Sequence, residues 1–403
     1  IIFGATGFTG RLCAEYMAQN YPTSVKWAIA GRNRKKLDEI LGVVKGINPA
    51  ANPAIIIADS FDGKAVEQMC AQTKVLATTS GPFTTYGENV IASCAKLGTH
   101  YLDITGETPW VSDMQEKYSQ TAEQSGAKIV NFAGFDSIPS DLGALMVAQF
   151  IKEQSGKPVK SIKHMVGAME GEASGGTIAS ALTMMSQFFT QPVKMITKSR
   201  DAHMLTPVGK KGKDTVPAGI SPGYDSDLKL FTAPWVMSFT NNHVVRKSAA
   251  FLDYGPNFTY SEHMLCSGGP LGFLLAMGTS VGFALAPLIM VFAVVPPFKY
   301  ITNMFLPQPG QGPSKETIKN GHFTITIIGK SDSTPSSMAV GIVKGIQDPG
   351  YGETSKMLME SALCLALQEK ELPKKSGFLT TAMAMGQPLI QRLRNAGMTF
   401  EVK

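Results

Sequence analysis

Short apolar runs alternate with helical spacings over the first third of the chain. The runs have the length and composition of buried parallel strands, and they lie at residues 1–3, 26–30, 54–59, 75–79, 99–104 and 128–131. The segments between them, such as 37–41, 64–72 and 89–97, have the spacing of helices. This alternation predicts βαβ units and an α/β domain with a doubly wound parallel sheet over residues 1–140.

The pattern changes beyond residue 160. Strand-like segments follow one another without regular helical crossovers, at 163–168, 244–251, 258–265, 322–328 and 337–343. We therefore predict a second, α+β domain over residues 141–350 with a mostly antiparallel sheet. Residues 351–403 are predicted to form a C-terminal helical region that packs back on the core.

One long segment of the second domain is uncharged. Residues 264–298 contain no Asp, Glu, Lys, Arg or His, and 271–295 is long enough to span a bilayer. Pro287 and several glycines weaken it as a free helix. Three interpretations stay open: a transmembrane helix, a kinked helical pair lying in a membrane or lipid monolayer, and a buried helix in a dimer or lipid pocket.

A glycine-rich turn follows the first strand and leads into a helical segment. It holds the candidate cofactor residues Gly4, Thr6, Gly7, Phe8, Thr9 and Gly10. Glycines at such a turn allow bare backbone to approach a pyrophosphate, which then lies at a helix N-terminus. The turn therefore predicts a Rossmann dinucleotide site, and its GxxGxxG spacing is common among domains that use NADP.

The end of the second strand indicates which dinucleotide is bound. An NAD enzyme has Asp or Glu there for the ribose 2′-OH, but this chain has Arg32, Asn33 and Lys36, and no carboxylate before Asp38. A guanidinium binds a 2′-phosphate well, so we predict NADP(H). Further adenine or ribose contacts are expected at the same sheet edge, from Asp59, Ser80, Gly81 and Pro82.

Proton donors for a hydride-transfer reaction are expected at the carboxyl edge of the same sheet. The candidates are Tyr86, Asp103 and Asp136, near Tyr101, Glu107 and Ser137. An aspartate donates a proton near neutral pH only if an apolar pocket raises its pKa. Alternatively, Asp136 caps the next helix and Asp103 braces a loop. The histidines and cysteines show no metal-ligand spacing, so no metal is predicted.

Composition limits the partners. The 403 residues are 44% hydrophobic with a formal charge of +6 and contain no lysine and arginine block, so we expect no nucleic-acid partner. Five scattered cysteines favour reduced thiols inside the cell. The apolar segment favours a homodimer or a membrane surface over a monomer in water.

Several motifs resemble the saccharopine dehydrogenase-like oxidoreductases. They are GATGFTG, WAIAGRN, SGPFTTYGE, YLDITGE (101–107), GFDSIPSD (134–141) and PGQGPS (309–314). Relatives include eukaryotic proteins of lipid droplets and membranes and bacterial trans-acting enoyl reductases. The resemblance implies NADP(H)-dependent reduction of an enoyl or carbonyl group in a lipid-like substrate at a membrane or droplet surface. Two alternatives remain: a nucleotide-binding protein with little catalysis, and a soluble amino-acid dehydrogenase of the saccharopine type.

Overall fold

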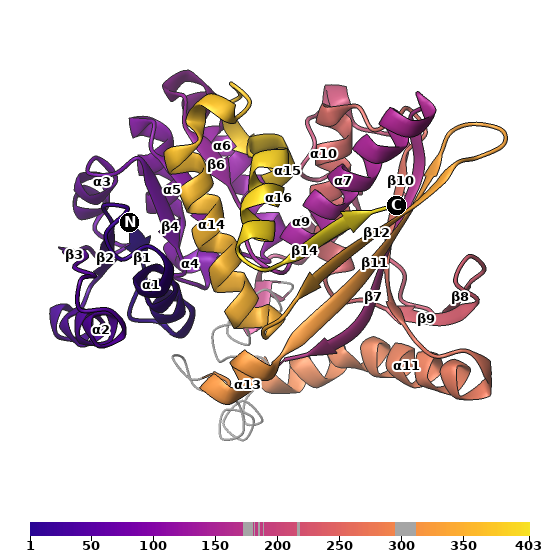
Figure 1. Ribbon diagram of the computed structural model, residues 1–403, viewed down its shortest axis with the longest axis horizontal. Coiled ribbons are helices and arrows are strands. Elements are labelled where there is room, and N and C mark those ends of the chain that lie inside the picture. Colours follow the sequence, from indigo (N-terminus) through magenta and orange to yellow (C-terminus); the bar gives the residue numbers. More distant parts are fainter. Residues whose placement is uncertain (172–179, 181, 184–185, 188, 216–217, 295–311) are drawn as a thin grey trace.

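The chain forms two sheets that stand side by side (Figure 1). The computed structural model describes residues 1–171, 180, 182–183, 186–187, 189–215, 218–294 and 312–403. Within these ranges each sheet has seven strands. The end of the apolar segment, 295–298, and the start of the PGQGPS motif, 309–311, lie outside the described residues.

The first sheet is parallel throughout, as predicted. Its order confirms the doubly wound fold, because β1 lies in the interior and the chain extends from it in both directions. In spatial order its strands are β13 (Gly377–Leu379), β6 (Lys128–Val130), β5 (His100–Asp103), β4 (Val75–Thr78), β1 (Ile2–Phe3), β2 (Ala28–Gly31) and β3 (Ala54–Ile57).

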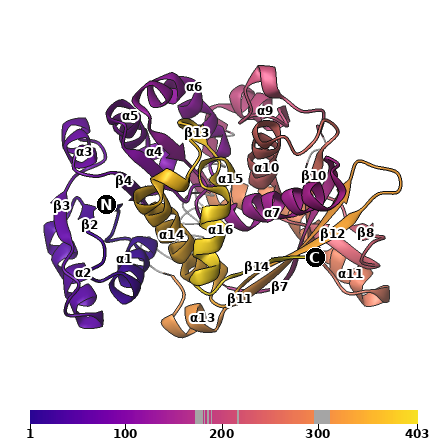
Figure 2. The ribbon, with the colours of Figure 1, turned by 45° about the horizontal axis from the view of Figure 1, so that its top comes forward.

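Helices cover both faces of the first sheet (Figure 2). One face carries α1 (Phe8–Asn20), α2 (Arg34–Ile47) and α14 (Thr354–Leu367). The other carries α3 (Gly63–Cys70), α5 (Glu88–Leu97) and α6 (Thr108–Ser125), and the short helix α4 (Phe83–Tyr86) precedes α5. Buried apolar side chains lie on both sides of the sheet, which explains why its strands read as continuous apolar runs.

The second sheet is mixed and mostly antiparallel. Only β7 and β10 pair in parallel among its described strands; the other neighbours are antiparallel. In spatial order its strands are β14 (Thr399–Val402), β12 (Met338–Gly345), β11 (His322–Ser331), β7 (Val159–Glu170), β10 (Thr259–Leu265), β9 (Leu230–Pro234) and β8 (Gly223–Asp225). The strands predicted at 163–168, 258–265, 322–328 and 337–343 are confirmed.

Helix α7 (Ile138–Ser155) connects the two sheets and packs closely on the second. A Cβ at Gly143 would overlap Ile327 of β11, and one at Gly329 or Gly341 would overlap Val147 of α7. The helix therefore lies against β11 and β12 because these three positions lack side chains. This packing fixes the position of the loop before α7, which belongs to the candidate active site.

The remaining described helices surround the second sheet and the C-terminus. They are α9 (Pro192–Arg200), α10 (Ser238–Leu252), α11 (Gly269–Val294), α13 (Lys315–Asn320), α15 (Thr381–Ala384) and α16 (Gly386–Asn395), with short helical turns at Val208–Lys210, Pro349–Glu353 and Glu369–Glu371. Helix α11 contacts β9 and runs along the second sheet on the side away from α7 (Figure 1).

One predicted strand is wrong, and four strands of the two sheets, β8, β9, β13 and β14, were not predicted. Residues 244–251, predicted as a strand, lie inside helix α10. Most of α10 is buried, including polar residues, so its apolar positions do not form a stripe on one side of the helix. The two adjacent β-branched residues Val244 and Val245 are also typical of a strand. The C-terminal region contains the predicted helices but also adds β13 to the first sheet and β14 to the second.

Candidate active site

The turn between β1 and α1 has the backbone shape that the glycine pattern predicts. Gly4 has φ +84°, a left-handed conformation that favours glycine. A Cβ at Gly10 would overlap the carbonyl group of Gly4 and the Cα of Ala5. Helix α1 therefore packs against the turn because position 10 has no side chain. Thr6, within the same turn, lies beside Gly31 at the end of β2.

The N-terminus of α1 is suited to an anion. Gly7 is its N-cap residue, no side chain caps the helix, and its first turn has no acidic residue. The first hydrogen bond of the helix runs from the Arg11 N–H to the Gly7 carbonyl at 2.9 Å. The N–H groups of Phe8, Thr9 and Gly10 come before it and are not used by the helical hydrogen bonds of α1. These N–H groups and the helix dipole match the requirements of a pyrophosphate.

The basic residues after β2 are exposed at the next helix start. Arg32 and Lys36 have no ion pair or side-chain hydrogen bond with the described residues, whereas Arg34 is paired with Asp38 at 3.0 Å. The Asn33 side chain caps α2 by accepting from the Lys36 N–H at 3.0 Å. Arg32 thus fits the predicted 2′-phosphate contact, while the Asn33 carbonyl oxygen is already used by the helix.

The predicted adenine and ribose contacts follow β3 and β4. Asp59 is half-buried, and its carboxylate accepts the Phe61 N–H at 3.0 Å. Ser80 lies against Gly4 of the glycine turn, and Gly81 and Pro82 lead directly into α4. Because neighbouring parallel strands end at one edge, these residues share the sheet edge with Arg32.

Tyr86 ends the short helix α4 beside this edge. It is half-buried, its ring centroid is 5.4 Å from that of Phe61, and its hydroxyl has no hydrogen bond with a described residue. The buried Glu107 carboxylate holds the start of α4, accepting the N–H groups of Phe83 at 2.9 Å and Thr84 at 2.8 Å. Glu107 is therefore a positioning residue for the segment that carries Tyr86.

Asp103 braces a loop. It is fully buried, and its carboxylate accepts the Tyr101 hydroxyl at 2.8 Å, the Asn131 amide at 2.7 Å and two backbone N–H groups. Burial raises its pKa to about 6 against the effect of these donors. With both oxygens engaged, Asp103 matches the bracing alternative better than that of a proton donor.

Asp136 lies on the loop between β6 and α7. It does not cap α7, whose N-cap is Ser137, and it has no hydrogen bond or ion pair with any described residue. Burial raises the pKa of Asp136 to about 6. A carboxyl with this environment holds its proton closer to neutral pH than an exposed aspartate, as a proton donor requires.

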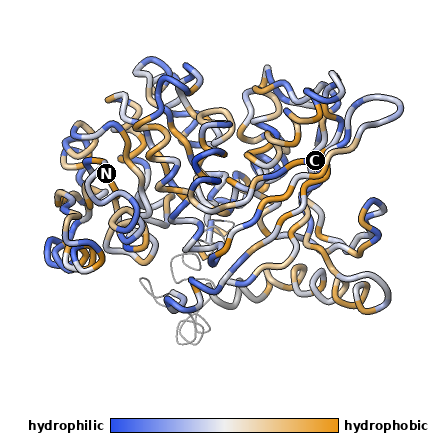
Figure 3. The backbone as a smooth tube through the Cα atoms, viewed as in Figure 1, coloured by the Kyte–Doolittle hydropathy of each residue, from blue (hydrophilic) through white to orange (hydrophobic). Residues whose placement is uncertain are grey.

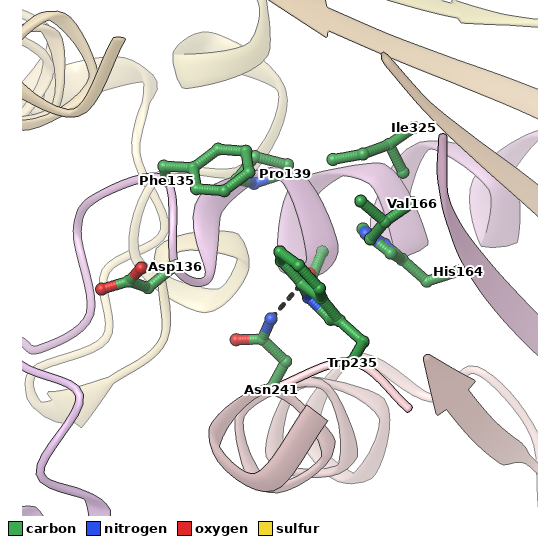
Figure 4. Close-up of a pocket in the computed structure, with 9 residues that line it drawn as sticks. Phe135, Asp136, Pro139, His164, Val166, Trp235, Asn241 and Ile325 are labelled. Atoms are coloured by element: carbon green, nitrogen blue, oxygen red, sulfur yellow. Dashed lines mark hydrogen bonds between the residues drawn. The ribbon is translucent and has the colours of Figure 1, made fainter. Parts of the chain in front are cut away.

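A narrow crevice extends from Asp136 along the start of α7 to β7 and β11 of the second sheet, and in this structure its side chains leave no room for a water molecule. Its described lining is mostly apolar or uncharged, and Figure 4 shows Asp136 and His164 at opposite ends with Trp235 between them. The lining consists of Phe135, Asp136, Pro139, Ser140, His164, Val166, Trp235, Asn241 and Ile325. No Lys or Arg belongs to this set, so the crevice favours an uncharged, largely apolar ligand.

A buried polar network supports one wall of the crevice. Asn241 of α10 accepts from Ser137 at 2.7 Å and donates to Ser140 and to Glu262 of β10, each at 3.0 Å. The Tyr260 hydroxyl donates to Glu262 at 2.6 Å, and burial raises the pKa of Glu262 to about 7. The network ties the GFDSIPSD loop to the second sheet and thereby fixes the backbone beside Asp136.

Three crevice residues and one residue of the supporting network have no signal in the sequence. His164, Trp235 and Asn241 line the crevice from β7, the turn after β9 and α10, and Glu262 of β10 supports Asn241. They meet only because the second sheet packs against α7. No group of three or more metal-ligating side chains occurs among the residues that the structure describes.

Comparison with known proteins matches the whole chain. The family model for the saccharopine dehydrogenase NADP binding domain matches residues 1–130. A trans-acting enoyl reductase of Mycobacterium bovis is 31% identical over 416 residues, covering 99% of this chain and 96% of the relative. A Mycobacterium tuberculosis protein provisionally given the same name is 33% identical over 413 residues, covering 100% and 96%.

The chain belongs to the saccharopine dehydrogenase-like oxidoreductases. The match confirms the resemblance and the NADP-binding domain, and with the glycine turn it makes the chain an NADP-binding oxidoreductase. The particular cofactor contacts, Arg32 foremost, stay predictions.

Solved structures confirm the fold of these oxidoreductases over the full length. Saccharopine dehydrogenase (L-Glu forming) from Saccharomyces cerevisiae has a TM-score of 0.53 at 12% identity, covering 100% of this chain and 98% of the other. Homospermidine synthase from Legionella pneumophila, in complex with NAD, has a TM-score of 0.52 at 9% identity, covering 100% and 90%. At these identities the likeness extends to the fold alone.

Proposed function

We propose that the protein uses NADPH to reduce an enoyl or carbonyl group of a lipid-like substrate. The observation that carries the proposal is Asp136, an unpaired carboxyl with a raised pKa at one end of a largely apolar crevice. Because relatives are named trans-acting enoyl reductases, we favour an enoyl group over a carbonyl group as the one that is reduced.

Each part of the site has a distinct task in this reaction. The α1 N-terminus and Arg32 bind the cofactor phosphates. The crevice, which is closed in this structure, holds the substrate once its side chains move apart. NADPH, when bound, would supply the hydride for the β-carbon of the enoyl group. Asp136 would donate its proton to the α-carbon, which completes the reduction of the double bond, and its carboxylate would then take a proton back from water.

The crevice argues against the amino-acid dehydrogenase alternative. A substrate with several carboxylates requires basic partners, and none of the described residues lining the crevice is Lys or Arg. The alternative with little catalysis is disfavoured by Asp136, because a half-buried carboxyl without a partner among the described residues costs stability that a purely structural role would not require.

Steady-state oxidation of NADPH with a trans-2-enoyl thioester tests the proposal. We expect turnover by the unaltered protein and a loss of about 100-fold or more in kcat for Asp136→Asn, with NADPH affinity retained. Asp253→Asn, an exposed change at the end of α10, is the matched control and should keep full activity. An active Asp136→Asn enzyme would exclude Asp136 as the donor, and absence of turnover by the unaltered protein would contradict the proposed reaction.

We further propose that the protein works at a membrane or lipid-droplet surface, through helix α11. By length and composition this helix could cross a membrane: the window Gly269–Ala286 has a mean hydropathy of 1.5, and 17% of it is buried. Figure 3 shows the apolar helix along the side of the second sheet. Its Phe273 packs on Phe231 of β9 at 5.6 Å, and Phe283 stacks on Phe239 of α10 at 5.8 Å.

The outer side of α11 supports a helix lying on the surface. Leu271, Leu274 and Leu288 are 64%, 65% and 55% exposed. Contact with the sheet on one side and exposed leucines on the other fit an interfacial helix better than one that crosses the bilayer. The predicted homodimer and the lipid-droplet branch of the family stay predictions.

Flotation with lipid vesicles tests this location. Burying one leucine contributes about 1.5–3 kcal/mol, so Leu274→Lys with Leu288→Lys should lower vesicle binding at least about 100-fold. Leu367→Lys, at a position 56% exposed on α14, is the control. If the unaltered protein stays at the bottom of the gradient, the surface location is wrong.

A further inference from the structure

His164 is a buried polar residue without a partner. It lies on β7, the central strand of the second sheet, and is 1% exposed. Its Nδ1 is enclosed and has no hydrogen-bond partner, and the ring has no ion pair or hydrogen bond with any described residue. Buried ring nitrogens are normally hydrogen-bonded, because leaving one unpaired costs stability. Its position therefore needs an explanation in terms of function.

The ring belongs to the substrate crevice. His164 lines it at the end opposite Asp136, beside Val166, and the Trp235 ring lies between the two ends (Figure 4). Once the side chains of the crevice move apart to admit a substrate, reacting carbons at Asp136 and a chain along Trp235 would bring a later part of that chain to His164. This region is otherwise apolar, because Val166 and Ile325 line it from β7 and β11.

The surroundings of His164 select the chemistry of its partner. Burial lowers the pKa of His164 to about 3, so the ring is neutral near pH 7 and offers one donor and one acceptor. No charged side chain within the described lining lies at this end. A carboxylate or ammonium group would be desolvated there without a counter-charge, which is costly. A neutral hydroxyl or keto oxygen can bond the ring at no such cost.

We propose that His164 is a specificity residue that hydrogen-bonds a second, neutral oxygen of the substrate, remote from the double bond that is reduced. The substrate class is then an oxygenated enoyl chain, carrying a hydroxyl or keto group several atoms along, rather than a plain hydrocarbon chain. This inference rests on the proposed reductase function and deepens it. His164 does not touch the reacting carbons; it determines which acyl chain is reduced efficiently.

The test uses the whole protein and compares two kinds of substrate of equal length. One is a plain trans-2-enoyl thioester, and the other is a series of such thioesters with one hydroxyl at successive positions along the acyl chain. We expect the unaltered protein to prefer the best hydroxylated chain by about 10- to 100-fold in kcat/KM, as a buried hydrogen bond permits. His164→Phe should abolish this preference while activity on the plain chain persists.

Two further variants keep the test decisive. His164→Gln retains a donor and an acceptor and should keep part of the preference, and it replaces His164→Phe if that variant does not fold. His322→Phe, at an exposed position of β11, is the matched control and should preserve the preference. Equal kcat/KM for plain and hydroxylated chains with the unaltered protein would overturn the inference but not the reductase function. Absence of turnover on all chains would overturn the reductase function itself.

Discussion

Replacing Arg32 with alanine is expected to weaken binding of NADPH but not of NADH. Arg32 is exposed at the end of β2 and has no ion pair or side-chain hydrogen bond among the described residues, so its guanidinium is available to a 2′-phosphate. A hydrogen bond to a charged group contributes about 1.5–3 kcal/mol, and exposure to solvent puts Arg32 near the lower value. We therefore expect a rise of about 10-fold in the Kd for NADPH.

Fluorescence titration with both cofactors measures this change. Arg34→Ala is the matched control, because Arg34 is two residues away, is also exposed and is already paired with Asp38 at 3.0 Å. It should alter neither Kd by more than about twofold. The added affinity for NADPH should also decline with salt, since the contact is exposed. An equal loss for NADH and NADPH, or an equal effect of Arg34→Ala, would refute the assignment of Arg32 to the 2′-phosphate.

Three further predictions concern the site and its framework. Gly10→Ala places a Cβ on the Gly4 carbonyl, so it should lower the free energy of unfolding by about 1–3 kcal/mol in thermal melting and abolish NADPH binding in titrations. Gly42→Ala, with open space around its Cβ, is the control and should change neither. Arg246→Ala breaks a 2.9 Å ion pair with Asp214, both side chains being 2% exposed, and should cost about 3–5 kcal/mol in urea unfolding; a cost below about 1 kcal/mol would contradict this. Only the protonated Asp136 donates, and its pKa is raised to about 6, so reduction should be fastest below pH 6 and fall about tenfold per pH unit above it; a pH-independent rate would exclude this donor.

The sequence identified those parts of the fold whose signals are local. The glycine turn lies within ten residues and joins β1 to α1, so its glycines predict its geometry. The strands of the first sheet are buried on both faces and read as apolar runs. Helix α10 was mistaken for a strand for a related reason: a helix buried on most sides shows no helical stripe.

The substrate crevice was beyond sequence prediction because its residues are distant in the chain. Asp136 was identified from its place after a strand, but His164 and Trp235 lie on β7 and after β9 and meet it only through the packing of α7 on the second sheet. The short strand β13 was missed because three residues carry too little periodicity to be recognised.

Transfer of deuterium from labelled NADPH to the product tests whether the protein reduces an enoyl group. The protein is incubated with a trans-2-enoyl thioester and NADPH carrying deuterium at the transferred position, and the product is analysed by mass spectrometry and NMR. We expect a saturated thioester with one deuterium at the β-carbon and a solvent hydrogen at the α-carbon. Product without deuterium, or no reduction of any enoyl thioester by protein that binds NADPH, would contradict the proposed reaction.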